Sequence, residues 1–151
     1  MIYLEDVTVG DVAEMGTYAV TRDEVIEFAS KYDPQPFHLS DEEAAKTHFG
    51  RIAASGWHTA AMTMAIIVRH VMGREQASLG SPGVDALRWL KPVYPGDTIS
   101  AATTVIEVTP SRSKPDMGSV RSDIVVKNQD GDAVMTFTSI LLMRRRPAEN
   151  A

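Results

Sequence analysis

The 151-residue sequence contains no cysteine, which excludes disulfide bonds and thiolate chemistry. Because this absence fits a reducing compartment, we expect a cytoplasmic protein. Basic charge is also scarce: 15 Lys and Arg against 20 Asp and Glu give a net charge of −5, which disfavours nucleic-acid binding. The most apolar run, residues 60–68, is well short of the ~18 residues that span a membrane. The first ten residues lack the features of a signal peptide, so we expect none.

The sequence predicts one domain, because 151 residues suit a single core and there are no repeats or linkers. Residues 21–32 predict a helix that begins with a capping box at Thr21 and Glu24. Residues 40–48 predict a second, shorter helix. The longest helix is expected at 56–73. Its apolar residues go nearly all the way round, so we expect it to be buried on most sides.

The rest of the chain is rich in Val, Ile and Thr, which favour strands. Five strands are expected, at about 13–20 and at 83–93, 97–109, 118–129 and 132–146. Turn sequences stand at 95–97 and 128–132. These elements predict an α+β domain in which an antiparallel sheet curls around the long helix.

The stretch "YDPQPFH", residues 32–38, places Asp33 and His38 five residues apart. Pro34 and Pro36 lie between them and exclude a regular helix. Two interpretations are open. Either Asp33 ends the preceding helix and His38 is a partly buried loop residue, or the prolines hold an acid and a base in one geometry.

A catalytic site would also need a group that polarises a carbonyl and an apolar slot. The segment "AASG", 53–56, leads into the N-terminus of the long helix, where free backbone N–H groups point outward. Gly56 would let a carbonyl oxygen approach the backbone closely, and Ser55 either caps the helix or takes part in the site. Residues that could form the slot, or simply the core, are Phe37, Phe49, Ile52 and Trp57.

The order and spacing of these residues resemble the MaoC-like dehydratases, also called (R)-specific enoyl-CoA hydratases. Their motif has an Asp, a Pro-containing spacer and a His five positions on, and later a small residue and Gly that open a long helix. The region 79–112 also resembles their strands, with a P-x-x-P-G-D turn from Pro92 to Asp97. The resemblance covers roughly residues 15–145.

This resemblance implies the hot-dog fold, a homodimer or larger assembly, an acyl-CoA substrate and no cofactor. Asp33 and His38 match the catalytic pair, and Gly56 matches the backbone donor to the thioester carbonyl. Gln35 stands where the family often has Asn, and Ser55 where many members have His, which leaves substrate preference open. The residues expected to bind substrate are Gln35, Pro36, Phe37, Ser55, Trp57 and His58.

The implied reaction adds water to a 2-enoyl thioester, or removes it from a 3-hydroxyacyl thioester, with one water held between Asp33 and His38. Which of the two is the base stays open, as do the acyl group and the direction. Two alternatives remain. A hot-dog thioesterase typically carries a carboxylate on or beside its central helix, and 57–73 has none. A non-catalytic acyl-binding module would need no Asp–His pair.

The other charged and metal-binding side chains give weaker signals. The spacing of His48, His58 and His70 does not match a metal site, and we expect none. The run "RRR", 144–146, is interpreted as a charged strand end and tail. Basic residues that could meet the phosphates of CoA are Arg88, Lys91, Arg112 and Lys114.

Overall fold

The strands form a single antiparallel sheet of five in the computed structural model, which describes residues 1–149. The strand order is β1-β3-β4-β5-β2. The strands are β1 (Val12–Ala19), β2 (Gly83–Trp89), β3 (Thr98–Pro110), β4 (Met117–Lys127) and β5 (Ala133–Arg144). All five predicted strands are present, and β1 and β2 form the two edges.

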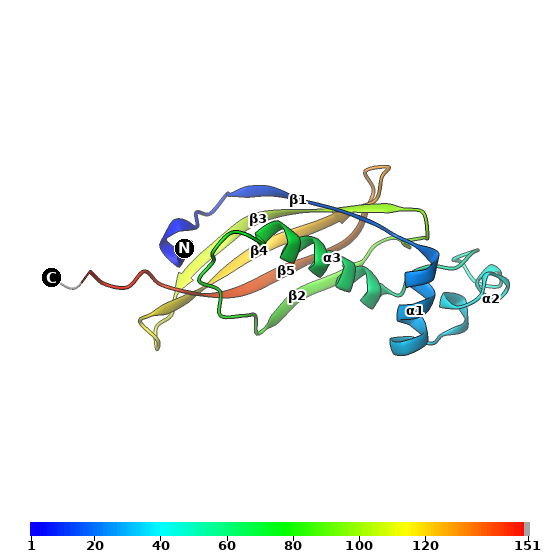
Figure 1. Ribbon diagram of the computed structural model, residues 1–151, viewed down its shortest axis with the longest axis horizontal. Coiled ribbons are helices and arrows are strands. Elements are labelled where there is room, and N and C mark those ends of the chain that lie inside the picture. The colour runs from blue at the N-terminus through cyan, green and yellow to red at the C-terminus, as the bar shows by residue number, and fades with distance from the viewer. Residues whose placement is uncertain (150–151) are drawn as a thin grey trace.

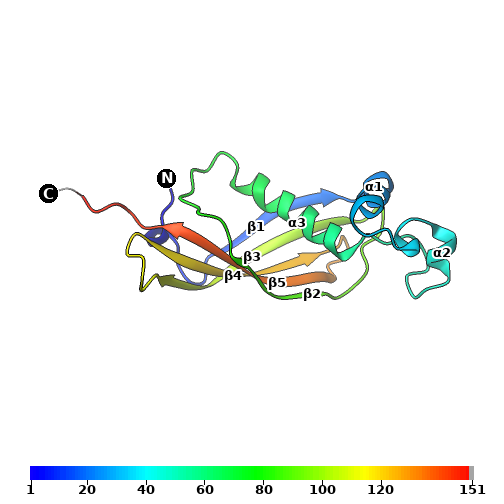
Figure 2. The ribbon, with the colours of Figure 1, turned by 90° about the horizontal axis from the view of Figure 1, so that it is seen from below.

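The helices gather on one face and at one end of this sheet. They are α1 (Arg22–Tyr32), α2 (Asp41–Ala45) and α3 (Gly56–Val71), with the short 3₁₀ helix η2 (Pro36–His38). A second 3₁₀ helix, η1 (Leu4–Asp6), lies at the other end of the sheet, near the termini (Figure 1). Figure 1 shows α1 and α2 at the end of the sheet opposite the two termini. In Figure 2 α3 lies along one face of the sheet, which confirms the predicted α+β arrangement of a long helix against an antiparallel sheet.

The start of α1 matches the predicted cap only in part. The Thr21 hydroxyl accepts from the backbone N–H of Glu24 at 3.3 Å. The Glu24 carboxylate, however, accepts from the Tyr18 hydroxyl at 2.5 Å, so it serves the contact between α1 and β1. Helix α2 ends at Ala45, earlier than predicted, because the Thr47 hydroxyl donates to the Ala44 carbonyl and turns the chain.

The expectation that the long helix is buried on most sides is wrong for the single chain. The sheet and α1 cover only one side of α3, where His58, Thr59, Met62, Thr63 and Ile66 are buried. The opposite side exposes an apolar stripe whose members are between 46% and 70% exposed: Trp57, Met64, Val68 and Met72. Apolar residues all round a helix therefore do not mean burial all round it here, because the side of α3 away from the sheet carries an exposed apolar surface.

Strand β2 carries an irregularity close to its end. Asp85 pairs with Thr138 and Arg88 with Thr136, so three steps on β2 face two on β5. Ala86, inside this bulge, has φ +53°, in the left-handed region. A bulge shifts the alternation of side chains by one residue, so it decides on which face of the sheet Trp89 lies. The strand then stops short of the predicted residue 93, because the Leu90 and Lys91 N–H groups share the Val134 carbonyl.

The P-x-x-P-G-D turn ties two connections together. The Asp97 carboxylate is buried, and it accepts from the Tyr94 N–H at 2.9 Å and from the Gln129 amide at 3.0 Å. Gln129 in turn accepts from the Thr98 N–H at 3.0 Å. Since Gln129 belongs to the β4–β5 hairpin, this carboxylate fixes the turn against that hairpin.

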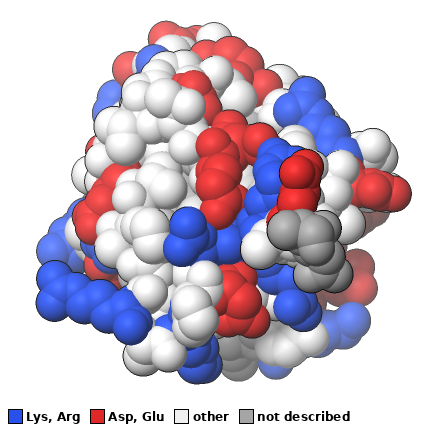
Figure 3. Space-filling view, turned by 90° about the vertical axis from the view of Figure 1, so that its left-hand side faces the viewer, with Lys and Arg blue, Asp and Glu red and all other residues white. Residues whose placement is uncertain are grey.

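The arginines after β5 are paired within the chain. Arg145 contacts Glu5 at 2.9 Å and Arg146 contacts Asp6 at 2.6 Å, which fastens the segment after β5 to η1. Figure 3 shows basic and acidic side chains interspersed at this end of the molecule. This supports the interpretation of "RRR" as a charged strand end. Within residues 1–149, no helix has the length and apolar character to cross a membrane.

Candidate active site

The "YDPQPFH" segment folds back on itself so that Asp33 and His38 meet. Asp33 closes α1, and its N–H donates to the Ala29 carbonyl at 2.9 Å. Pro36 then begins η2, where a proline needs no N–H partner, and η2 ends at His38. Asp33 Oδ2 and His38 Nε2 come to lie 3.3 Å apart. The two residues therefore form one site.

Two donors orient the Asp33 carboxylate. The Gln35 amide donates to Oδ1 at 2.7 Å, and the Ser55 hydroxyl donates to Oδ2 at 2.7 Å. Burial of the carboxyl raises the pKa of Asp33, but the hydrogen bonds from Gln35 and Ser55, together with the positive charge that the His38 ring carries when it is protonated, outweigh this effect. The pKa therefore lies below its ordinary value, and the carboxylate is ionised at neutral pH.

The His38 ring is held by the backbone of the segment that precedes α3. Its Nδ1 lies 2.7 Å from the Ala53 carbonyl oxygen, and the side chain is only 6% exposed. Because a carbonyl only accepts, Nδ1 carries the proton, which leaves Nε2 of the neutral ring as an acceptor facing Asp33. Two acceptors side by side are complementary to a molecule that donates two hydrogens, such as water.

Ser55 and Gly56 bring the start of α3 to the same place. Ser55 is the N-cap residue, yet its side chain makes no capping bond and is used for Asp33 instead. Gly56 is the first residue of α3, so its N–H has no acceptor within the helix. A β-carbon on Gly56 would lie 2.4 Å from the Trp89 ring, so the indole packs directly on this glycine. Close packing against Trp89 is therefore one physical reason why this position needs glycine.

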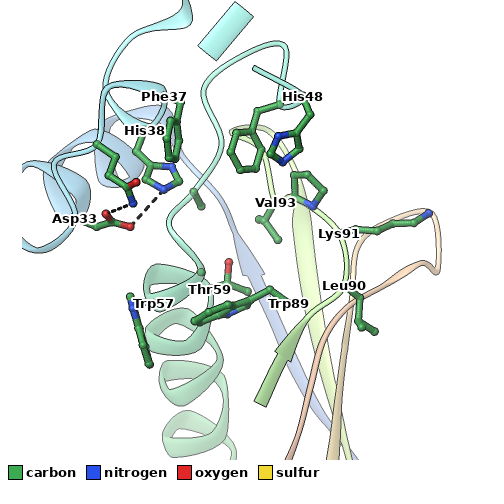
Figure 4. A pocket seen from close by; sticks show the side chains of 15 residues that line it. Asp33, Phe37, His38, His48, Trp57, Thr59, Trp89, Leu90, Lys91 and Val93 are labelled. Atoms are coloured by element: carbon green, nitrogen blue, oxygen red, sulfur yellow. Dashed lines mark hydrogen bonds and ion pairs between the residues drawn. The ribbon is translucent and has the colours of Figure 1, made fainter. Parts of the chain in front are cut away.

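A cleft of about 530 Å³ opens over these groups. Figure 4 shows Asp33 and His38 on one side, and His48, Val93 and Lys91 on the other. The full lining is Asp33, Gln35, Phe37, His38, His48, Phe49, Ala54, Gly56, Trp57, Thr59, Trp89, Leu90, Lys91, Pro92 and Val93. The cleft thus combines one ionised carboxylate with mostly aromatic and aliphatic walls.

Some residues expected at the site lie elsewhere. Pro36, Ser55 and His58 do not line the cleft, although Ser55 acts through Asp33. The His58 ring stacks on Phe28 of α1 with centroids 4.7 Å apart, and burial lowers its pKa. Ile52 is fully buried in the core.

Two groups of charged and metal-binding side chains can also be placed. Of the four basic residues considered for CoA phosphates, only Lys91 lines the cleft, and it is also paired with Asp132 at 3.1 Å. Arg112 and Lys114 belong to the β3–β4 connection at the far end of the sheet (Figure 1). Within residues 1–149, no three His, Cys, Asp or Glu side chains come together as a metal site would require.

Sequence reasoning missed the residues that come from outside the motif. Trp89 and Val93 flank the end of β2, more than 30 positions after Gly56, and nothing local marks them as cleft residues. Thr59 is buried, one turn after Gly56 on the same side of α3, and its spacing could have placed it at the site. Trp89 and Val93, by contrast, reach the cleft through pairing between strands that are far apart in the sequence.

Comparison with known proteins now assigns the chain to a family. Residues 7–128 match the family described as MaoC like domain. The chain belongs to the MaoC-like domain family. The solved structure of a MaoC-like dehydratase from Rhodospirillum rubrum is 39% identical, covers 97% of this chain and 99% of its own, and has a TM-score of 0.89. The R-hydratase PhaJ1 of Pseudomonas aeruginosa is 26% identical with a TM-score of 0.70, covering 99% and 94%.

A further relative is the 3-hydroxybutyryl-CoA dehydratase of Methylorubrum extorquens, which is 29% identical over 139 residues. The match covers 89% of this MaoC-like chain and 83% of the relative. The resemblance found in the sequence is thus confirmed. The predicted hot-dog fold is confirmed as well, because the five-stranded sheet and long helix match those of the MaoC-like and R-hydratase structures.

Proposed function

We propose that this MaoC-like protein is a hydro-lyase that adds water to a 2-enoyl-CoA thioester or removes it from a 3-hydroxyacyl-CoA thioester. The observation that carries the proposal is the close approach of Asp33 Oδ2 and His38 Nε2, 3.3 Å apart beside the first N–H of α3. The relative from Methylorubrum extorquens is named for a 3-hydroxyacyl-CoA substrate, which supports the same class here.

Gly56 would polarise the substrate. Its N–H donates to the thioester carbonyl oxygen, and the positive end of the α3 dipole stabilises the negative charge that develops there. This interaction withdraws electrons from the β-carbon of the enoyl group. Because the charge grows toward the enolate, the stabilisation is greater in the transition state than in the ground state.

Asp33 and His38 would supply and return the protons. Water donates to both acceptors, its oxygen bonds to the β-carbon, and the pair takes up one of its protons. A proton from the pair then reaches the α-carbon as the enolate collapses to the thioester, so H and OH have been added across the double bond. Dehydration follows the same steps in reverse.

Substitution of either partner tests the mechanism. We expect Asp33→Asn and His38→Ala each to lower kcat roughly 100-fold or more, since each removes one acceptor for water. The loss of enoyl absorbance from crotonyl-CoA gives the rate. Asp23→Asn, an exposed carboxylate in the first turn of α1, is the matched control and should stay at wild-type kcat. Near-wild-type turnover by either site variant would contradict the mechanism.

The two alternative functions give different products in the same experiment. A thioesterase would release free CoA thiol without hydrating the enoyl group, although 57–71 of α3 carries no carboxylate to activate water. A binding module would bind acyl-CoA and turn over no chain length. The acyl group and the physiological direction are to be read from a panel of enoyl- and 3-hydroxyacyl-CoA thioesters.

We also propose that two copies associate through α3 and β2. The exposed stripe of α3, formed by Trp57, Met64, Val68 and Met72, and the open edge of β2 are surfaces that a second copy would cover. Light scattering should give twice the 16.5 kDa chain mass, and Val68→Asp should lower it. A monomer at micromolar concentration would contradict this proposal. A cytoplasmic location stays a prediction from the missing cysteines.

A further inference from the structure

Two tryptophans meet at the end of the cleft that faces the middle of the sheet. Trp57 of α3 and Trp89 of β2 contact each other edge to face, with centroids 5.1 Å apart and an angle of 81° between the rings. Figure 4 shows both indoles beneath Thr59, on the side away from His48. The pair thus closes the space between α3 and β2 next to the proposed reaction centre.

Trp89 is held in this position from two directions. Its ring packs so closely on Gly56 that a β-carbon added to this glycine would lie only 2.4 to 2.8 Å from the nearest ring atoms. The bulge at Ala86, whose φ is +53°, precedes it on β2 and decides the face on which it lies. A backbone in the left-handed region is costly for alanine, so the surrounding structure must favour this arrangement.

Apolar surface continues along both elements beyond the pair. On α3 the next exposed large apolar side chain is Met64, and on β2 it is Val84. An acyl chain that extended past the reacting carbons in this direction would run along α3 and β2, the two elements that the proposed second copy covers, and it would first have to pass the two indoles.

We propose that Trp89, braced by Trp57, is a specificity-determining residue that limits the site to short acyl groups. This inference rests on the proposed function, because it assumes a thioester carbonyl at the Gly56 N–H. The indole lies on that same glycine, so the carbons that follow the enoyl group meet it first. Each carbon added beyond the enoyl group therefore brings the chain closer to the two indoles, so a crotonyl group should be accepted more readily than an octenoyl group.

The test compares kcat/KM for crotonyl-, hexenoyl- and octenoyl-CoA. Wild type should favour the shortest. In Trp89→Leu the ratio of kcat/KM for octenoyl-CoA to kcat/KM for crotonyl-CoA should rise roughly tenfold or more, because a change in the shape of an apolar pocket alters discrimination between substrates by about this factor. Ile106→Ala, an exposed apolar residue of β3 outside the cleft, is the control and should leave the ratio unchanged. An unchanged ratio in folded Trp89→Leu, or a wild type that prefers octenoyl-CoA, overturns the inference.

Binding separates this inference from the proposed function. Calorimetry with butanoyl- and octanoyl-CoA, which cannot be hydrated, should show tighter binding of the shorter thioester to wild type and a smaller difference in Trp89→Leu. Length-graded binding without turnover would overturn the hydratase proposal and support the limit on chain length. Turnover at equal rates for all chain lengths would support the hydratase proposal and overturn the limit on chain length. If Trp89→Leu does not fold, Trp89→Phe should shift the ratio in the same direction, and no shift overturns the inference.

Discussion

Removal of the Ser55 hydroxyl is the sharpest test of how this site holds its acid. In Ser55→Ala, Asp33 Oδ2 loses a donor at 2.7 Å from a side chain that is only 1% exposed. A hydrogen bond to a charged group contributes about 1.5–3 kcal/mol. If that contribution goes into holding the carboxylate against His38, kcat/KM for crotonyl-CoA should fall roughly 10- to 100-fold.

The pH dependence of kcat/KM should also change in Ser55→Ala, in a direction that follows from the pKa of Asp33. The hydrogen bonds hold the pKa of Asp33 below its ordinary value, so the ionised form persists as pH falls. Without Ser55 the pKa must rise, and the acidic limb of the kcat/KM profile should move to higher pH. A ¹³C NMR titration of the Asp33 carboxyl measures the same change without any substrate.

A matched serine variant serves as the control. Ser40→Ala removes the hydroxyl that caps α2, so it should cost up to about 1 kcal/mol of stability and leave the pH profile unchanged. The reasoning is refuted if Ser55→Ala keeps both the wild-type kcat/KM and the wild-type acidic limb, since the hydroxyl would then hold nothing that catalysis uses.

Three further predictions concern stability. Gly56→Ala should cost about 1–3 kcal/mol in chemical denaturation because its new methyl overlaps the Trp89 ring, and the cost should shrink in a Trp89→Leu background; equal costs in both would contradict the packing argument. Asp97→Ala should also lose about 1–3 kcal/mol, since the Tyr94 N–H loses its acceptor, and a wild-type denaturation midpoint would argue against that role. Burial holds the pKa of His58 below its ordinary value of 6.5, so on acidification the unfolded chain binds a proton at His58 before the folded chain does, and the free energy of unfolding falls as pH drops below 6.5. In His58→Phe the free energy of unfolding should therefore depend less on pH between about pH 7 and 5. The same pH dependence in both proteins would count against this role of His58.

The sequence by itself determined the elements and the family. Val, Ile and Thr patterns placed five strands, and caps placed the helices, because these signals depend on neighbours a few residues apart. The prolines between Asp33 and His38 made their approach predictable for the same reason. Helix α2 and strand β2 were both predicted too long. Helix α2 ends where the Thr47 hydroxyl bonds to the Ala44 carbonyl, and β2 ends where two N–H groups share the carbonyl of Val134, which is far away in the sequence.

Only the tertiary structure decided which residues surround the acid and base. The sequence left two roles open for Ser55, a helix cap or a part of the site. The Ser55 hydroxyl bonds to Asp33 because the end of α1 brings that carboxylate within 2.7 Å of it. The apolar circumference of α3 suggested burial on most sides, but one sheet covers one side of a helix, and the stripe from Trp57 to Met72 stays exposed. Trp89 reaches Gly56 through strand pairing and a bulge, contacts between residues far apart in the chain that no local pattern encodes.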